Sequence, residues 1–256
     1  MNRILLEPSE IVKGVATFGG DRAEHVLNVL HGEVGQVLKT GEVDGLIGTS
    51  VIREIRPEGP EIVVDCAHRD ESLRPWVNLV LAPPRPRAMK RLLPQLATLG
   101  VGKIVLVGAK KVEKDFWGAT LLKPENYRPL LVDGLMQAGT SILPTIELRR
   151  NFRKFVREEL DAMLPSSNRI VAHPYEAKDV RPETGDVSQS LNRPIDQSEQ
   201  SNNSALTLAI GPEGGWTDEE VALLEEHGFS RYSLGSRILR TDTATIALLA
   251  QLMPQD

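Results

Sequence analysis

The sequence predicts an α/β protein in which a small β-barrel domain precedes a larger α/β domain. The first seventy residues contain mainly short β-branched and apolar runs cut by Gly-rich turns, a pattern typical of strands. From residue 75 on, predicted strands alternate with predicted helices, which favours a parallel sheet with helices on both faces. The charged stretch 69–75 separates the two patterns, so we expect domains at 1–70 and 75–256.

In the N-terminal part, strands are predicted at 12–18, 35–41, 45–55 and 61–68. The segment 21–31 instead spaces its apolar residues as a helix does, and Gly32 follows it as a stop signal. One helix among about five or six short strands suggests a small barrel.

In the C-terminal part, the predicted strands are 76–82, 103–109, 145–149, 169–173, 205–211 and 231–235. The predicted helices are 86–100, 125–139, 152–164, 217–228 and 241–253. Pro94 lies inside the first of these helices, so we expect a kink there or a late start. Residues 176–204 are polar and lack an apolar period, which predicts a long flexible insertion.

The composition is that of a globular protein without a membrane span. The chain has 256 residues, 41% of them hydrophobic, and no run of about eighteen apolar residues. The N-terminus lacks the apolar stretch of a signal peptide, so we expect a cytoplasmic protein. Cys66 is the single cysteine, which excludes an internal disulfide, and no metal-ligand cluster is visible.

The net charge of −5 hides a strongly basic region. Between Arg85 and Lys123 there are nine Lys or Arg residues against Glu113 and Asp115, a local balance of +7. A second basic cluster lies at 149–157. Clustered basic side chains are what phosphate binding needs, although a solvated helix face would have the same composition.

A Gly-rich loop at 209–216 follows one predicted strand and precedes a helix. Three glycines and a proline in five positions predict a tight turn that a ligand can approach closely, at the sheet edge where α/β proteins bind ligands. Thr217 and Glu220 predict a capping box that starts the helix, and Gly228 ends it. The glycine spacing fits neither a Walker loop nor a dinucleotide fingerprint, and a plain strand-to-helix turn is the alternative.

A second loop at 234–244 again follows a short strand and opens a helix, for which Thr241 is a plausible N-cap. Arg240 directly before a helix start is unfavourable, because the helix dipole prefers an acid there. This suggests that Arg240 holds a loop or meets an anion.

The two loops together, IGPEGGWTDEE at 210–220 and LGSRILRTDTA at 234–244, resemble the C-terminal signature of the RsmE family of SPOUT RNA methyltransferases. The resemblance implies a PUA-like β-barrel RNA-binding domain followed by an α/β domain whose last segment forms a trefoil knot, a rare exception to unknotted topology. It also implies that S-adenosyl-L-methionine binds in the knot loops. The implied cofactor-binding residues are His173, Ile210, Gly211, Glu213, Gly214, Gly215, Leu234, Gly235, Ile238, Leu239 and Thr243.

The reaction of the family is methylation of N-3 of a uridine in small-subunit (16S) ribosomal RNA. N-3 lies on the Watson–Crick edge and carries a proton, so the base must be unpaired and the proton must be removed. The resemblance implies Glu213 as proton acceptor, with Arg240 or Arg237 stabilising the uridine oxygens. Glu213 could instead tie the backbone amides of its loop.

The resemblance further implies a homodimer that binds ribosomal RNA or the small ribosomal subunit. The expected RNA-binding residues are Arg3, His25, His31, Arg85, Arg87, Lys90 and Arg91. Three positions depart from the family: His31 replaces an Arg, 95–101 lacks a Lys and a Glu, and 137–140 lacks an Arg. A SPOUT enzyme for another RNA target, such as a ribose 2′-hydroxyl, and an RNA-binding protein that retains the cofactor pocket therefore remain alternatives.

Overall fold

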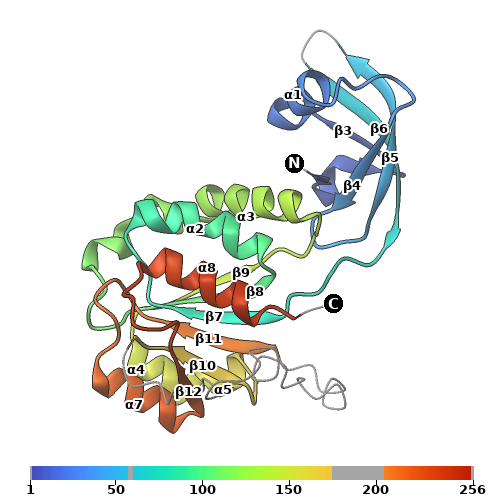
Figure 1. The fold of residues 1–256 in the computed structure, drawn as a ribbon. Coiled ribbons are helices and arrows are strands. Elements are labelled where there is room, and N and C mark those ends of the chain that lie inside the picture. The colour runs from blue at the N-terminus through green and yellow to red at the C-terminus, as the bar shows by residue number, and fades with distance from the viewer. Residues whose placement is uncertain (1, 57–59, 175–204, 255–256) are drawn as a thin grey trace. The chain divides into compact units, whose positions relative to one another are not determined.

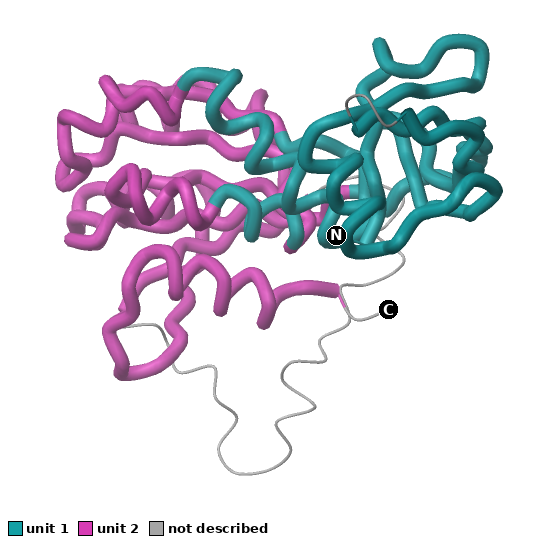
Figure 2. Tube along the Cα trace, turned by 90° about the horizontal axis from the view of Figure 1, so that it is seen from above, with its two compact units in different colours: residues 1–74, 93–98, 123–144 teal, residues 75–92, 99–122, 145–256 magenta. Residues whose placement is uncertain are grey.

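The computed structural model describes residues 2–56, 60–174 and 205–254. The chain divides into two compact units, which are coloured separately in Figure 2. Unit 1 comprises 1–74, 93–98 and 123–144, and unit 2 comprises 75–92, 99–122 and 145–256. The predicted insertion at 176–204 lies outside the described residues.

Unit 1 is built on a six-stranded sheet in the order β1-β4-β5-β6-β3-β2. Strand β1 pairs with β4 in parallel, and the other neighbours are antiparallel. The bounds are β1 Ile4–Leu6, β2 Ile11–Val12, β3 Val15–Phe18, β4 Val37–Glu42, β5 Ile47–Arg56 and β6 Glu61–Asp70, with helices α1 Gly20–Asn28 and α3 Pro124–Ala138. The β-rich character is confirmed, but β1 was not predicted because its three residues show no alternation.

Helix α1 covers the core of unit 1 with Ala23 and Val26, which are fully buried. It ends three residues before the predicted end, and His31 follows with a left-handed φ of 50°. The turn is closed by Gly32, whose backbone N–H donates to the carbonyl of Val26 at 2.9 Å. A Cβ at Gly32 would lie 2.5 Å from the Val26 side chain, so only glycine fits here.

An ion pair between Arg22 of α1 and Glu10 fastens the helix to the start of the chain. The Arg22 guanidinium donates to both Glu10 carboxylate oxygens, at 2.9 and 2.5 Å, and to the carbonyl of Leu5. Burial raises the pKa of Glu10, but the bonds from Arg22 outweigh it and the net pKa is lowered. A lowered folded-state pKa stabilises the fold above the unfolded pKa of about 4.3, and this stability is lost as the pH falls through the folded value.

We therefore expect Glu10→Gln to lower the free energy of unfolding by about 1.5–3 kcal/mol at pH 7, the range for a hydrogen bond to a charged group. The difference from wild type should shrink steadily as the pH is lowered below 4, because the wild-type carboxylate is then protonated too. Urea unfolding followed by circular dichroism at several pH values measures this. Glu24→Gln, an exposed change on the same helix, is the control, and an equal loss in both variants would contradict the prediction.

Unit 2 is a wholly parallel six-stranded sheet in the order β12-β10-β11-β7-β8-β9. Figure 1 shows α2 and α8 on one face and α4, α5 and α7 on the other, which confirms the predicted parallel sheet with helices on both sides. Every residue of the central strand β11 is buried, as a doubly covered strand requires. The strands are β7 Val77–Leu81, β8 Val101–Val107, β9 Thr145–Arg149, β10 Arg169–Ala172, β11 Leu206–Ile210 and β12 Phe229–Tyr232.

The helices of unit 2 follow the predicted order with local differences. Their bounds are α2 Pro86–Thr98, which continues into unit 1, α4 Phe152–Lys154, a π-helical turn Phe155–Glu159, α5 Leu160–Met163, α7 Asp218–Glu226 and α8 Thr241–Leu252. Short 3₁₀ turns occupy Lys114–Gly118 and Thr120–Leu122. No described helix is long and apolar enough to cross a bilayer.

Three local expectations need correction. Helix α2 begins at Pro86 and runs past Pro94, so a late start is wrong. Strand β12 ends at Tyr232, because the chain turns into the Gly235 loop, where φ is +110°, instead of continuing to residue 235. Arg240 is the N-cap of α8, and Thr241 is its first helical residue.

The predicted capping box of α7 is confirmed. The Thr217 hydroxyl accepts from the backbone N–H of Glu220 at 3.3 Å, and the Glu220 carboxylate accepts from the N–H of Thr217 at 2.9 Å. Glu220 is buried and also accepts from the N–H of Lys110 at 2.7 Å. This carboxylate therefore fixes both the start of α7 and the loop after β8.

Candidate functional site

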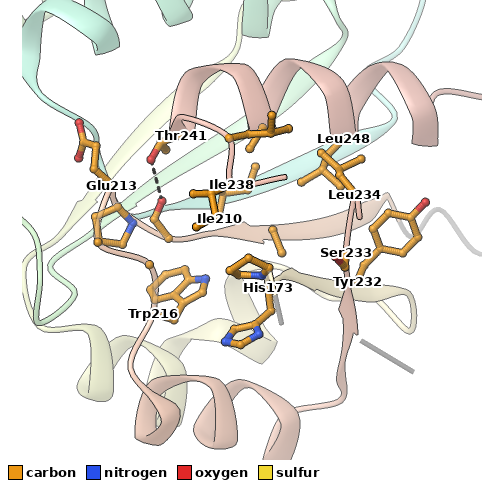
Figure 3. Close-up of a pocket in the computed structure, with 18 of the residues that line it drawn as sticks. His173, Ile210, Glu213, Trp216, Tyr232, Ser233, Leu234, Ile238, Thr241 and Leu248 are labelled. Carbon is orange, nitrogen blue, oxygen red and sulfur yellow. Dashed lines mark hydrogen bonds between the residues drawn. The ribbon is translucent and has the colours of Figure 1, made fainter. Parts of the chain in front are cut away.

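A cavity of about 670 Å³ lies beyond the carboxyl ends of β10, β11 and β12. Its lining comes from three chain segments, from one face of α8 and from Lys111 and Asp218. The segments are 172–174, 210–216 and 231–239, the last without Ser236. Open α/β sheets bind ligands at this edge, and both motif loops of the sequence meet here. Figure 3 shows the lining side chains around the opening.

The Gly-rich loop after β11 forms one wall. The N–H of Gly215 donates to the carbonyl of Pro212 at 2.8 Å, which closes a turn, and Gly215 has a left-handed φ of +67°. A Cβ at Gly211 would lie 2.9 Å from the backbone nitrogen of Trp216, so the loop can fold back on itself only with glycine there. Lys111 reaches across and donates from Nζ to the carbonyl of Gly214 at 2.7 Å. The wall is thus a tight turn held from outside by a lysine.

Trp216 closes the bottom of the cavity. Its indole is 5% exposed, and its ring lies 5.2 Å from that of Phe152, centroid to centroid. The indole Nε1 is buried and has no hydrogen-bond partner among the described residues. A buried unpaired donor costs free energy, so a ligand atom that accepts from this N–H would relieve the cost.

Helix α8 supplies the opposite wall through Thr241, Ala244 and Leu248, which share one face at helical spacing. The Thr241 hydroxyl donates to the carbonyl of Gly211 at 3.4 Å and joins the two motif loops. Between them, the loop after β12 brings Ile238 to the mouth of the cavity, where its side chain is 75% exposed.

Ten of the eleven predicted cofactor-binding residues line this cavity. The exception is Thr243, which is exposed on α8; the residues that face the cavity are its neighbours Thr241 and Ala244. The ten are His173, Ile210, Gly211, Glu213, Gly214, Gly215, Leu234, Gly235, Ile238 and Leu239.

The two predicted catalytic residues occupy the rim. Glu213 lines the cavity but is exposed, and its Oε1 accepts from the backbone N–H of Arg85 at 3.0 Å, directly before α2. Arg240 is exposed and is not among the lining residues, whereas Arg237 is. The alternative prediction for Glu213 was a hydrogen bond to backbone amides of its own loop. The carboxylate does accept from a backbone amide, but that amide belongs to Arg85 in another segment.

The predicted RNA-binding residues at 85–91 lie on α2 or directly before it, and two of them pair with acids of other segments. Arg85 pairs with Glu113 at 2.9 Å, and Arg91 pairs with Asp242 of α8 at 3.2 Å. Arg87 and Lys90 are exposed, with no hydrogen bond or ion pair to the described residues. The bonds of Glu213 and Asp242 therefore hold this basic helix start against both motif loops.

The three predicted RNA-binding residues of unit 1 differ in exposure. The Arg3 guanidinium donates to the carbonyls of Thr40, Gly48 and Gly139, and burial lowers its pKa although Asp70 opposes this. The Nε2 atom of His25 is buried without a partner in the described chain, and His31 is exposed. Arg3 thus has a structural task within unit 1.

Several lining residues were missed by sequence reasoning. Leu248 could have been found from helical periodicity, since it lies seven residues after Thr241. Trp216 lies inside the first motif, but it was not predicted because an aromatic residue after a turn more often packs in the hydrophobic core than lines a binding site. Lys111 and Tyr232 gave no signal, and burial raises the pKa of the Tyr232 hydroxyl despite its bond with Gln251.

The cavity combines an apolar slot with a polar loop and a charged rim. Ile210, Ile238 and Leu248 can cover a flat ring, while the backbone groups of 211–215 can meet polar atoms. No cluster of three metal-binding side chains exists among the described residues. The arrangement suits a small organic molecule with a planar apolar part and a polar tail.

The comparisons with known proteins agree with this geometry. A model of the RNA methyltransferase domain matches residues 71–253. The chain is 30% identical to the ribosomal RNA small subunit methyltransferase E of Treponema pallidum, over 99% of this chain and 91% of that protein. It is 22% identical to the protein of the same name from Bacillus subtilis, over 100% of this chain and 97% of that protein.

Two solved structures are similar over nearly the whole chain. A methyltransferase of Legionella pneumophila, solved with the bound cofactor SAM, has a TM-score of 0.70 and 26% identity, with 98% of this chain and 96% of that chain covered. A ribosomal RNA small subunit methyltransferase E of Neisseria gonorrhoeae has a TM-score of 0.68 and 23% identity, with 98% and 95% covered. At 23% identity, the second comparison shows similarity of fold alone.

Proposed function

Since the chain belongs to the RsmE family of SPOUT RNA methyltransferases, we propose that it methylates N-3 of a uridine in small-subunit (16S) ribosomal RNA. The chain is an S-adenosylmethionine-dependent rRNA methyltransferase. The observation that carries the proposal is the cavity in which both motif loops meet at the carboxyl ends of the strands. The position of the methyl group on the base is inferred from the family.

The cavity fits S-adenosylmethionine, which supplies the methyl group when bound. Ile210, Ile238 and Leu248 offer apolar surface to its adenine ring, and the unpaired Trp216 indole N–H offers a donor. The glycine loop leaves backbone amides and carbonyls unscreened by side chains. The volume of about 670 Å³ lies within the usual range for small-molecule sites.

The acceptor base is expected on the side of the cavity where α2 begins. Basic side chains of α2, held there by the Arg85–Glu213 and Arg91–Asp242 bonds, can neutralise RNA phosphates next to the target. A uridine presents N-3 only when it is unpaired, so the enzyme must bind it splayed from its neighbours. We propose His25 and His31 as further RNA contacts, and Arg3 as a residue that supports RNA binding through the fold of unit 1.

We keep Glu213 and Arg240 as proposed catalytic groups, the first to accept the N-3 proton and the second to stabilise the uridine oxygens. The bond to Arg85 gives Glu213 a second task, holding α2. Glu213→Gln separates the two, because an amide oxygen still accepts from the Arg85 N–H but cannot take a proton. We expect kcat to fall at least about 100-fold, with little change in KM for S-adenosylmethionine.

The measurement is methyl transfer from labelled S-adenosylmethionine to small ribosomal subunits, as a function of both substrate concentrations. Glu226→Gln, an exposed change on α7 at a residue that lines neither of the two cavities found in the described structure, is the control. An unchanged kcat in Glu213→Gln would mean that Glu213 only holds α2 through the Arg85 N–H and does not accept the N-3 proton.

Finer features of the family complete the proposal. We propose a PUA-like barrel at 1–70, a SPOUT domain at 75–256, and a trefoil knot in which the loop before α8 threads the chain; the bond between Thr241 and Gly211 supports close passage of these segments. We propose a homodimer that uses two exposed apolar residues, Ile246 of α8 and Met253 directly after it. We also propose that the enzyme is cytoplasmic, because its proposed substrate is ribosomal RNA.

Nucleoside mass spectrometry of small-subunit ribosomal RNA from a deletion strain tests the function. Loss of 3-methyluridine, restored by the wild-type gene, is the expected result. Loss of a 2′-O-methylated nucleoside instead would assign another target. An unchanged nucleoside profile, with S-adenosylmethionine binding intact in isothermal titration, would favour an RNA-binding protein, and absent binding would exclude every enzymatic assignment.

A further inference from the structure

A second cavity, of about 370 Å³, lies beyond the carboxyl ends of β8 and β9. Gly108 follows β8 and Arg150 follows β9, and the N–H of Gly108 donates to the carbonyl of Arg149 at 2.9 Å. A Cβ at Gly108 would lie 2.0 Å from the Arg150 carbonyl oxygen, so only glycine lets the two strand ends meet. The lining residues are Gly108, Lys110, Arg150, Asn151, Phe152, Arg153, Thr217, Glu219 and Glu220.

The two cavities share a wall. Phe152 lines the second cavity, and its ring packs on Trp216, which lines the first. The consecutive residues Lys110 and Lys111 line one cavity each. The second cavity is therefore a direct neighbour of the first, in which the methyl donor is proposed to bind.

Two cationic side chains of the second cavity, those of Lys110 and Arg150, form no ion pair with the described residues and can bind an anion. Glu220 accepts from the backbone amides of Lys110 and Thr217, and Glu219 pairs with Arg153, so both acids and Arg153 are engaged. The ammonium of Lys110 is exposed and has no partner among the described residues.

Arg150 is the second available cation, and it is held in place. Its Nη2 donates to the carbonyl of Trp117 at 3.3 Å, and its guanidinium lies 5.8 Å from the centroid of the Trp117 ring. These contacts involve one nitrogen and one face of the guanidinium, and the group is exposed. A preoriented guanidinium suits the tetrahedral oxygens of a phosphate.

We infer that the second cavity binds the phosphodiester backbone of the substrate RNA beside the target nucleotide, through Lys110 and Arg150. This inference rests on the proposed function, because it takes the occupant of the first cavity's rim to be RNA. Trp117 acts as a positioning residue for Arg150.

The test uses Lys110→Gln and Arg150→Gln, with Arg157→Gln as matched control. Arg157 is exposed, belongs to the same basic cluster and does not line the cavity. The Kd for a fluorescein-labelled single-stranded oligouridylate is measured by anisotropy over a salt series. Each cavity variant should weaken binding about 3–10-fold and reduce the slope of log Kd against log salt by about 0.7, one phosphate contact. Arg150→Lys, which keeps the charge, should recover most of the affinity.

The same variants are then assayed for methyl transfer to small ribosomal subunits. KM for the subunit should rise in the cavity variants, while KM for S-adenosylmethionine stays at the wild-type value. Cavity variants that match Arg157→Gln, with an active wild-type enzyme, would overturn the inference. A wild-type protein that neither binds S-adenosylmethionine nor methylates would overturn the proposed function instead. The anisotropy series is repeated with added inorganic phosphate at matched ionic strength. The cavity variants should still bind the oligouridylate more weakly than wild type does. If phosphate abolished this difference in Kd, the cavity would be assigned to a free anion, which would contradict the RNA assignment.

Discussion

Gly211→Val is expected to lower kcat/KM for methyl transfer by about 100-fold or more, the scale on which small misplacements of reacting groups act. A Cβ at Gly211 would lie 2.9 Å from the backbone nitrogen of Trp216 and 3.2 Å from the carbonyl carbon of Gly215. These atoms are backbone, so they can yield only by opening the turn that forms the cavity wall. The loop that binds the cofactor and the bond from Thr241 to the Gly211 carbonyl would both be displaced.

Gly214→Ala is the matched control three residues away. A Cβ there would meet only the side chain of Lys111, with its Cδ at 2.9 Å, and a lysine chain can move aside. We expect Gly214→Ala to keep S-adenosylmethionine affinity within about threefold, below ~0.7 kcal/mol. Isothermal titration and steady-state kinetics measure both variants, and circular dichroism checks that each is folded. Equal losses in the two variants would show that backbone approach at Gly211 is not what shapes the site.

Trp216→Ala is expected to lower the free energy of unfolding by about 3–5 kcal/mol, the usual cost of truncating a buried large aromatic. Trp216 is 5% exposed and packs on Phe152 between the two cavities. Its removal leaves a hole that the surrounding strands and helices cannot fill, and it opens the bottom of the first cavity. Chemical denaturation followed by far-ultraviolet circular dichroism gives the stability, because tryptophan fluorescence would itself change.

Trp216→Phe distinguishes packing from hydrogen bonding. The phenyl ring retains most of the contact with Phe152, and the variant lacks the buried indole N–H that has no partner. We expect stability within about 1.5 kcal/mol of wild type, as for other shape-conserving core changes. Affinity for S-adenosylmethionine should fall about 3–10-fold, the loss of one hydrogen bond. Unchanged affinity together with unchanged stability would mean that the indole N–H does not contact the cofactor.

The order of strands and helices in unit 2 could be predicted because each element carries its own pattern. Continuous apolar runs mark doubly covered strands such as β11, and the Thr217–Glu220 capping box marks the start of α7 within four residues of sequence. Short elements were different: β1 has three residues, and the end of β12 depends on the Gly235 loop, so neither has a periodic signal of its own.

The candidate site divides in the same way. The two Gly-rich loops, which carry nine of the predicted residues of the cavity wall, could be recognised in the sequence, because left-handed φ values such as those of Gly215 and Gly235 favour glycine. The side of α8 that faces the cavity depends on how the helix packs, so Thr241 and Ala244 line the cavity while Thr243 does not. It also decided that the Glu213 carboxylate meets the backbone N–H of Arg85, 128 residues away in the chain. Such contacts depend on the packing of distant segments, which no local pattern encodes, whereas a turn or a cap is set by its own neighbours.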